Sequence, residues 1–166
     1  MFETSGPFAL TAFFAGHVRA TGIFEDRFGT VRRRFIADMV GRFEGCAFVM
    51  TEDFVFDDGE KQHRVWRITP RDDGSFAATA NDIVGVATGV TIGSTIKMRY
   101  RHEVMIDGRA VVLSFDDQIH RLDRDNAIGR ARVNKWGVKV GELSIFFQRV
   151  AAQSLEPKPV GFQAAA

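Results

Sequence analysis

Two acidic residues and an arginine, Glu52, Arg64 and Asp82, recur at a spacing that could bring them together. The first two flank an Asp-Asp-Gly sequence that is typical of a β-hairpin turn. A guanidinium between two carboxylates can donate hydrogen bonds to both through its planar fork. Such a group can fix the polar end of a ligand, and its carboxylates could also transfer protons.

Turn lengths predict which of these side chains face each other. A three-residue loop in the first Asp-Asp-Gly turn places Glu52 opposite Arg64, and the same loop in the next such turn places Arg64 opposite Asp82. A four-residue loop at 42–45 would place Phe35 opposite Glu52. The predicted row across four strands is therefore Phe35, Glu52, Arg64 and Asp82.

Strand alternation puts this row on the apolar face of the sheet, together with Phe54 and Trp66. A lone buried charge costs several kcal/mol, so the three charged groups must hydrogen-bond to one another. Three interpretations remain open. The group could hold three strands in register, line the polar end of a ligand cavity, or act as a catalytic acid and base.

The elements that position these residues are short strands. Turn signals recur along the chain, and the segments between them alternate in polarity, which predicts an all-β fold with a single antiparallel up-and-down barrel of about ten strands. Closure would bury the apolar face and remove exposed sheet edges. A short helix is expected within 7–14. The barrel domain is predicted at 1–150, with a flexible C-terminal tail at 151–166.

Composition excludes several classes of protein. The net charge of +1, with acids and bases interspersed, does not favour a nucleic acid as the partner. No apolar stretch is long enough for stable membrane insertion, and the N-terminus lacks the pattern of a signal peptide. We therefore expect a cytoplasmic protein. The oligomeric state cannot be predicted.

Metal and cofactor sites are not expected. Cys46 is the single cysteine, and the four histidines are scattered, with only His102 on the predicted inner face. His102 is either a core histidine or a single axial haem ligand. The glycines at 85, 89 and 93 lack the other residues of a phosphate-binding loop. The sequence thus predicts no metal and no cofactor.

Six motifs in a fixed order resemble a bacterial family catalogued as a domain of unknown function. They are FFAGHVRATGIFEDRFGTVRRRF, EDFVFDDG, HRVWRI, ANDIVGVATG, SFDDQIHRLD and GRARVNKWGVKVGEL, and they cover roughly 13–149. The resemblance implies a lipocalin-like barrel, and its members tend to be encoded beside enzymes that modify membrane fatty acids. Some members are lipoproteins, whose signal sequence and acylated cysteine are not found here. The resemblance implies no activity and no site.

These observations together predict noncovalent binding of an apolar or fatty-acyl-like small molecule inside the barrel. The expected ligand-binding residues are Glu52, Arg64, Asp82, Trp66, Tyr100, Phe35, Phe54, Phe115 and Arg130. The Trp-Gly turn at 136–137 leaves two orientations open for Arg130: it faces outward, or it faces inward with Ile128, where it could meet Asp117 or a ligand carboxylate. Two alternatives remain: an enzyme or accessory factor in lipid modification that uses Glu52 or Asp82 for proton transfer, and a filled barrel that serves as an interaction module. No catalytic residue can be assigned.

Overall fold

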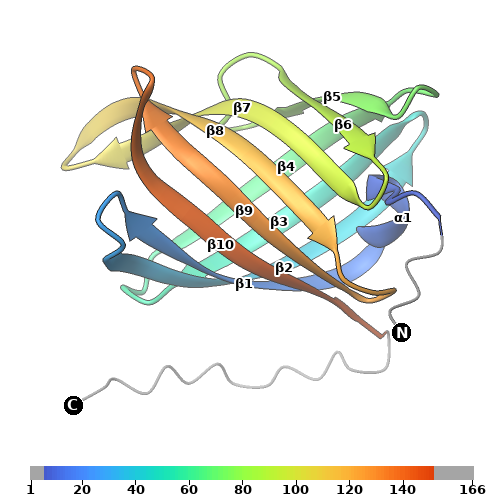
Figure 1. The fold of residues 1–166 in the computed structure, drawn as a ribbon, viewed down its shortest axis with the longest axis horizontal. Coiled ribbons are helices and arrows are strands. Elements are labelled where there is room, and N and C mark those ends of the chain that lie inside the picture. Colours follow the sequence, from blue (N-terminus) through green and yellow to red (C-terminus); the bar gives the residue numbers. More distant parts are fainter. Residues whose placement is uncertain (1–5, 152–166) are drawn as a thin grey trace.

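The computed structural model describes residues 6–151, which form one closed β-barrel (Figure 1). The elements in chain order are α1 (Leu10–Phe13), β1 (Gly16–Asp26), β2 (Val31–Glu44), β3 (Ala47–Phe56), β4 (Lys61–Pro70), β5 (Ser75–Ala80), β6 (Ala87–Ile92), β7 (Thr95–Ile106), β8 (Arg109–Arg121), β9 (Asn126–Lys135) and β10 (Val138–Val150). The tail predicted at 151–166 lies outside the described residues, apart from its first residue. The predicted short helix within 7–14 is confirmed by α1.

Each strand pairs antiparallel with its neighbours in the chain, and β10 pairs with β1 to close the sheet. Every strand of the described residues therefore has two partners, which is the condition for a barrel without exposed edges. The predicted up-and-down barrel of about ten strands is confirmed. The predicted pairing of Glu52 with Arg64 is also confirmed, and the structure pairs Trp66 with Ala80 and Tyr100 with Phe115.

The hairpin between β2 and β3 differs from the prediction. Its turn holds two residues, Gly45 and Cys46, rather than four, and Gly45 has the positive φ of +62° that such a tight turn favours. Phe35 consequently pairs with Phe56, and the expected pairing of Phe35 with Glu52 is wrong. The register differs by an even number of positions, so Phe35 stays on the inner face, where it is buried.

One end of the barrel, here called the closed end, is covered by α1 and the residues around it (right side of Figure 1). Phe8, Phe13 and Phe14 are buried there, and the Phe14 ring packs edge-on against Phe147 of β10 at 5.5 Å. Gly41 of β2 allows the backbone of Phe14 to lie close to that strand, because a Cβ at position 41 would lie 2.2 Å from the carbonyl oxygen of Phe14. Aromatic rings thus fill the closed end.

The opposite end, here called the open end, carries the β1–β2, β3–β4, β7–β8 and β9–β10 turns and the β5–β6 loop (left side and top of Figure 1). Inward-facing apolar residues near it keep partial exposure to solvent: Phe24, Phe54, Phe56, Val104, Val111 and Leu143. Inward-facing residues nearer α1 are buried: Val18, Phe48, Ile68, Ile96 and Phe147. The packing of the interior therefore loosens from the closed end towards the open end.

Candidate functional site

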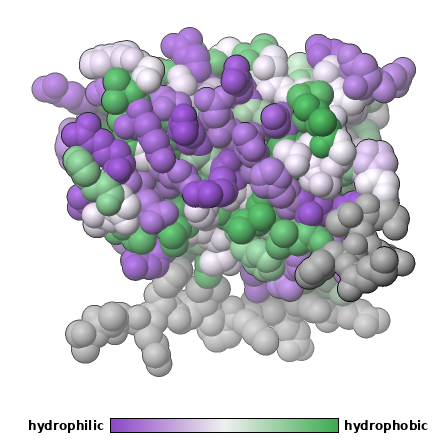
Figure 2. All heavy atoms as spheres, in the orientation of Figure 1, coloured by the Kyte–Doolittle hydropathy of each residue, from purple (hydrophilic) through white to green (hydrophobic). Residues whose placement is uncertain are grey.

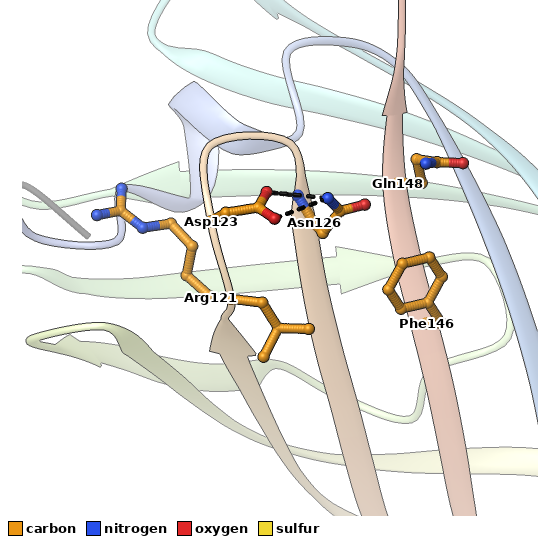
Figure 3. A pocket seen from close by; sticks show the side chains of 6 residues that line it. Arg121, Asp123, Asn126, Phe146 and Gln148 are labelled. Atoms are coloured by element: carbon orange, nitrogen blue, oxygen red, sulfur yellow. Dashed lines mark hydrogen bonds between the residues drawn. The ribbon is translucent and has the colours of Figure 1, made fainter. Parts of the chain in front are cut away.

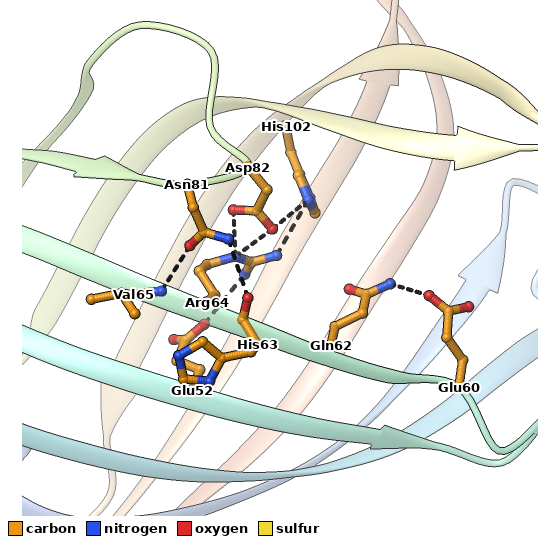
Figure 4. A network of polar contacts seen from close by, with 9 residues as sticks. All are labelled: Glu52, Glu60, Gln62, His63, Arg64, Val65, Asn81, Asp82 and His102. Carbon is orange, nitrogen blue, oxygen red and sulfur yellow. Dashed lines mark hydrogen bonds and ion pairs between the residues drawn. The ribbon is translucent and has the colours of Figure 1, made fainter.

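The polar group on the inner wall is positioned by the end of the β4–β5 ladder. The last paired residues of that ladder are Trp66 and Ala80, and the side chain of Asn81 then continues it. Its Oδ1 accepts a hydrogen bond from the backbone N–H of Val65 at 2.9 Å, and its Nδ2 donates to the carbonyl oxygen of His63 at 3.2 Å (Figure 4). This anchor fixes the next residue, Asp82, beside β4.

The loop that carries Asp82 is also attached to β7. The carbonyl oxygen of Asp82 accepts a hydrogen bond from the N–H of Glu103 at 3.1 Å, and Ile83 forms an isolated β-bridge with His102. These contacts with the backbone bring His102 next to Asp82 on the inner face. The loop thus joins two strands, β4 and β7, whose polar side chains meet.

The Arg64 group, defined as Glu52, Arg64, Asp82 and His102, converges on the guanidinium of Arg64 (Figure 4). Arg64 Nε donates to Asp82 at 2.8 Å and its Nη1 to Glu52 at 3.3 Å, while its Nη2 lies 3.3 Å from His102 Nε2. His102 Nε2 is 2.9 Å from Asp82, so the tautomer protonated at Nε2 donates to that carboxylate. The predicted meeting of Glu52, Arg64 and Asp82 on the inner face is confirmed.

Aromatic rings surround this group. The guanidinium of Arg64 lies 5.3 Å from the Phe54 ring centroid and 5.9 Å from that of Trp66. The ring contacts continue around the wall as pairs: Phe35 with Phe54, Trp66 with Tyr100, Tyr100 with Phe115, and His102 with Phe115. Eight of the nine residues expected to bind the ligand therefore form one continuous lining.

The electrostatics of the group differ between its two acids. Burial raises the pKa of Glu52, and the charge of Arg64 only partly offsets this effect. Burial also acts to raise the pKa of Asp82, but the hydrogen bond with His102 and the charge of Arg64 lower it to about 2. Asp82 is therefore ionised at neutral pH and forms the stable ion pair with Arg64. A carboxylate of this kind is a poor proton donor at that pH.

A third acid, Asp117, lies deeper on the inner wall. It faces Met98 across the β7–β8 ladder, and its Oδ1 is buried without a hydrogen-bond partner among the described residues. Burial raises the pKa of Asp117 to about 7, although hydrogen bonding by the Tyr100 hydroxyl and the charge of Arg64 act in the opposite direction. The strand alternation placed Asp117 inside, but sequence reasoning missed it as a site residue in its own right.

Arg130 does not belong to the lining. It lies on the outer face of β9, is 65% exposed and forms an ion pair with Glu142 of β10. The expectation that Arg130 faces inward with Ile128 is therefore wrong, because the inward positions of β9 are occupied by small or branched residues such as Ala131 and Val133. Arg33 does face inward but pairs with Asp58 and Glu60 near the β3–β4 turn, outside the Arg64 group.

Two pockets open at the surface of the described residues, and neither is lined by the Arg64 group. One, of about 670 Å³, is lined by Arg121, Leu122, Asp123, Asn126, Phe146 and Gln148 (Figure 3). Asp123 is engaged there by Asn126, which donates to it at 2.9 Å. The other, of about 370 Å³, follows the β6, β7 and β8 segments 88–90, 97–99 and 116–118. On the face drawn in Figure 2, hydrophilic side chains predominate, and hydrophobic ones form smaller patches between them.

The closed ten-stranded meander belongs to the lipocalin-like class of barrels. A solved structure of this class, the S-type phycobiliprotein lyase CPES from Guillardia theta, superposes with a TM-score of 0.58. The match covers 82% of this chain and 89% of the lyase at 9% sequence identity, so the likeness concerns the fold alone.

The chain belongs to the family described as "Protein of unknown function (DUF3833)", whose model matches residues 2–149. The resemblance seen in the sequence motifs is thereby confirmed. No curated protein matches the chain. No helix among the described residues has both the length and the hydropathy to cross a lipid bilayer.

Proposed function

We propose that the protein binds a small, largely apolar molecule of fatty-acyl type noncovalently in the open half of the barrel. The observation that carries this proposal is the gradient of burial along the inner wall. Apolar residues such as Phe54 and Leu143 face inward near the open end and remain partly exposed, whereas their counterparts towards α1 are buried. An apolar surface that is concave and accessible from one end is the usual form of a ligand site.

The hydrophobic clusters of the interior support the same location. One cluster, centred on Leu113, Phe115, Ala131 and Val133, lines the β8–β9 side of the open half. Its additional contacts come from β1, β7, β8 and β10. Phe54, Glu52 and Arg64 lie on β3 and β4, and the other two members of the Arg64 group, Asp82 and His102, lie in the β5–β6 loop and on β7. A ligand between this cluster and the Arg64 group would contact apolar residues on one side and a polar group on the other.

The charges of the lining favour a ligand whose polar end donates hydrogen bonds. Three acids, Glu52, Asp82 and Asp117, accompany one arginine, and Nε and Nη1 of Arg64 already donate to Asp82 and Glu52. A ligand carboxylate would add a further negative charge beside Asp82, which is ionised at neutral pH. The unpartnered Oδ1 of Asp117 instead offers an acceptor for a hydroxyl or amide group. Fatty alcohols and monoacylglycerols have this chemistry.

The position of the polar residues also sets the orientation of the ligand. Arg64 is near the start of β4 and His102 near the end of β7, so both lie towards the open end. Tyr100 and Asp117 lie further in, and the buried core towards α1 fills the space beyond. The polar end of the ligand would therefore enter first, and its apolar chain would extend towards the open end.

Uptake of Nile red, a neutral apolar dye, tests this function, with dodecanol and dodecanoate as competitors. We expect dye fluorescence to increase on binding and dodecanol to displace the dye more effectively than dodecanoate. Two adjacent valines of β8 give a matched pair of variants: Val111 faces inward against the Leu113 cluster, and Val112 is the next residue, on the outer face. Val111→Trp should weaken dye binding by about tenfold or more, and Val112→Trp should leave it unchanged.

Two outcomes would contradict the proposal. The interior is not the binding site if the two tryptophan variants bind the dye equally well. If the wild-type protein takes up no dye, and native mass spectrometry of the purified protein detects no bound apolar molecule, the protein does not have the proposed function. Stronger displacement by dodecanoate would refute the assignment of the polar end alone.

A further inference from the structure

Large apolar side chains are exposed in three turns at the open end of the barrel. Phe28 lies in the β1–β2 turn, Met105 adjoins the β7–β8 turn and Trp136 lies in the β9–β10 turn, and their exposed fractions are 77%, 69% and 91%. Val138, next to Trp136, is also exposed. Isolated apolar residues are common on protein surfaces, but a group of large ones at one place marks an interaction site.

These turns are neighbours around the barrel. The strand order β7, β8, β9, β10, β1, β2 brings the β7–β8, β9–β10 and β1–β2 turns together, with one following the other along the open end (left side of Figure 1). We call the set Phe28, Met105, Trp136 and Val138 the apolar rim. It borders the part of the inner wall that carries the partly exposed Phe24, Val104 and Leu143.

The conformation of Trp136 is unfavourable for the turn itself. The β9–β10 turn has two residues, Trp136 and Gly137, with φ angles of +50° and +78°. Asparagine, aspartate and glycine are preferred at the first position of such a turn, and a bulky residue with positive φ is strained there. Since the ring is almost fully exposed, packing within the protein does not compensate for the strain. A contact with another surface would account for the tryptophan.

Each of the two aromatic residues is accompanied by a cation. The guanidinium of Arg27 lies 4.7 Å from the Phe28 ring centroid, and the ammonium of Lys135 lies 4.6 Å from that of Trp136. Within the described part of the chain, neither cation forms an ion pair with an acid. The nearby Lys139, by contrast, is paired with Glu142. Two cations without an ion-pair partner in residues 6–151 therefore flank the apolar rim, and the β7–β8 turn carries one acid, Asp107.

The acids of the β3–β4 turn at the open end are engaged by arginines. The acids Asp57, Asp58 and Glu60 of the β3–β4 turn form ion pairs with Arg33 and Arg34. Arg27 and Lys135, which lack such a partner among the described residues, thus lie on the side of the apolar rim.

We propose that the apolar rim docks on the surface of a lipid bilayer that contains anionic lipids. Tryptophan and phenylalanine side chains insert at the boundary between head groups and acyl chains, and adjacent lysine and arginine side chains bind anionic head groups. This docking is peripheral and requires no membrane-spanning segment. It places the open end of the barrel against the bilayer, where a lipid head group would reach the Arg64 group with its acyl chain still in the membrane.

The docking proposal goes beyond the proposed function and can be tested separately from it. The assay is co-flotation of the protein with vesicles of phosphatidylcholine alone or of equal parts phosphatidylcholine and phosphatidylglycerol. We expect the wild-type protein to float with the mixed vesicles and much less with phosphatidylcholine vesicles. The double variant Phe28→Ser, Trp136→Ser should lose about tenfold or more of its partitioning.

A matched control comes from the other end of the barrel. Phe43 and Ile92 are 56% and 58% exposed near the closed end, so the double variant Phe43→Ser, Ile92→Ser removes a comparable apolar surface. It should float like the wild type. An equal loss in both double variants, or no flotation of the wild type with mixed vesicles, would overturn the proposal. Binding equal for both vesicle types would overturn the requirement for anionic lipid.

Charge variants test the role of the cations directly. Arg27→Gln with Lys135→Gln should remove the preference for phosphatidylglycerol, while adding salt should weaken flotation of the wild type. Nile red uptake by the Phe28→Ser, Trp136→Ser variant without vesicles separates the two proposals. If this variant still takes up the dye but no longer floats, docking and interior binding are distinct. If it loses dye uptake but still floats, the result contradicts the assignment of these two residues to docking and shows an effect on the interior site.

Discussion

Replacing Arg64 with methionine is the sharpest test of how the polar group is held in the barrel. Methionine retains much of the length of the side chain but removes the guanidinium that contacts both Glu52 and Asp82. The two acids would then remain on the inner wall without their shared counter-charge. The loss of stability would therefore come mainly from the missing counter-charge and not from a change in packed volume.

The burial of the three side chains sets the magnitude. The side chains of Arg64 and Glu52 are 11% and 8% exposed, so breaking this pair leaves a buried charge without compensation. Removal of one partner from a buried ion pair typically costs 3 to 5 kcal/mol. Asp82, which is 24% exposed, retains the contact with His102 and contributes less. We expect Arg64→Met to lower the free energy of unfolding by about 3 to 5 kcal/mol at neutral pH.

The same variant should show a characteristic dependence on pH. In the wild type the pKa of Asp82 falls from 3.8 to about 2 on folding, because the partners that favour ionisation outweigh burial. Its contribution, about 2 kcal/mol, is therefore present above about pH 4 and is lost as the pH falls towards 2. In the Arg64→Met variant, protonation of Glu52 and Asp82 removes their uncompensated negative charges and therefore stabilises the folded state. The difference in stability between variant and wild type should narrow on acidification.

Urea unfolding followed by circular dichroism gives both quantities. Arg130→Met is the matched control, since it removes an arginine that pairs with one acid but is 65% exposed on the outer face. Its cost should stay within about 1 kcal/mol. If Arg64→Met costs less than about 1 kcal/mol, or if its deficit is the same at about pH 4 and about pH 2, the group is not held as a buried ion network.

Two further predictions concern Asp117 and Gly89. The pKa of Asp117 is raised on folding from 3.8 to about 7, so the unfolded chain releases this proton at lower pH than the folded protein, and stability falls as the pH rises through this range. Asp117→Asn should therefore gain stability relative to the wild type between about pH 4 and pH 8, by roughly 2 to 4 kcal/mol, and parallel pH profiles of unfolding would contradict this. Gly89→Ala places a Cβ 2.0 Å from the buried Phe76 ring and should cost about 1 to 3 kcal/mol in thermal unfolding, so an unchanged melting temperature would show that the ring moves freely.

The sequence predicts much of the barrel because turn chemistry and strand alternation are local. The Asp-Asp-Gly turns close the β3–β4 and β4–β5 hairpins with hydrogen bonds from Phe56 N–H to the Glu60 carbonyl and from Arg71 N–H to the Ser75 carbonyl. Each such turn fixes the register of two strands, so the pairing of Glu52 with Arg64 follows directly. The position of the Asp82 side chain could also be anticipated, although its backbone lies beyond the β4–β5 ladder.

The incorrect expectations arise where local signals leave more than one choice. The segment around Gly45 can form either a four-residue loop at 42–45 or a two-residue turn of Gly45 and Cys46, and both keep Phe35 on the inner face. The bulge between Lys139 and Gly141 interrupts the alternation of β10, so a count across the Trp136 turn does not fix the orientation of Arg130. The partnership of His102 with Asp82 depends on the loop contact between them, which no local pattern indicates.

The aromatic filling beneath α1 has a consequence for selectivity. Because buried side chains fill the closed end, only the open half could hold the proposed ligand, and a long hydrocarbon tail would project from the open end rather than be enclosed. The protein is therefore expected to discriminate among molecules by the chemistry of their leading end, while tolerating tails of widely different length.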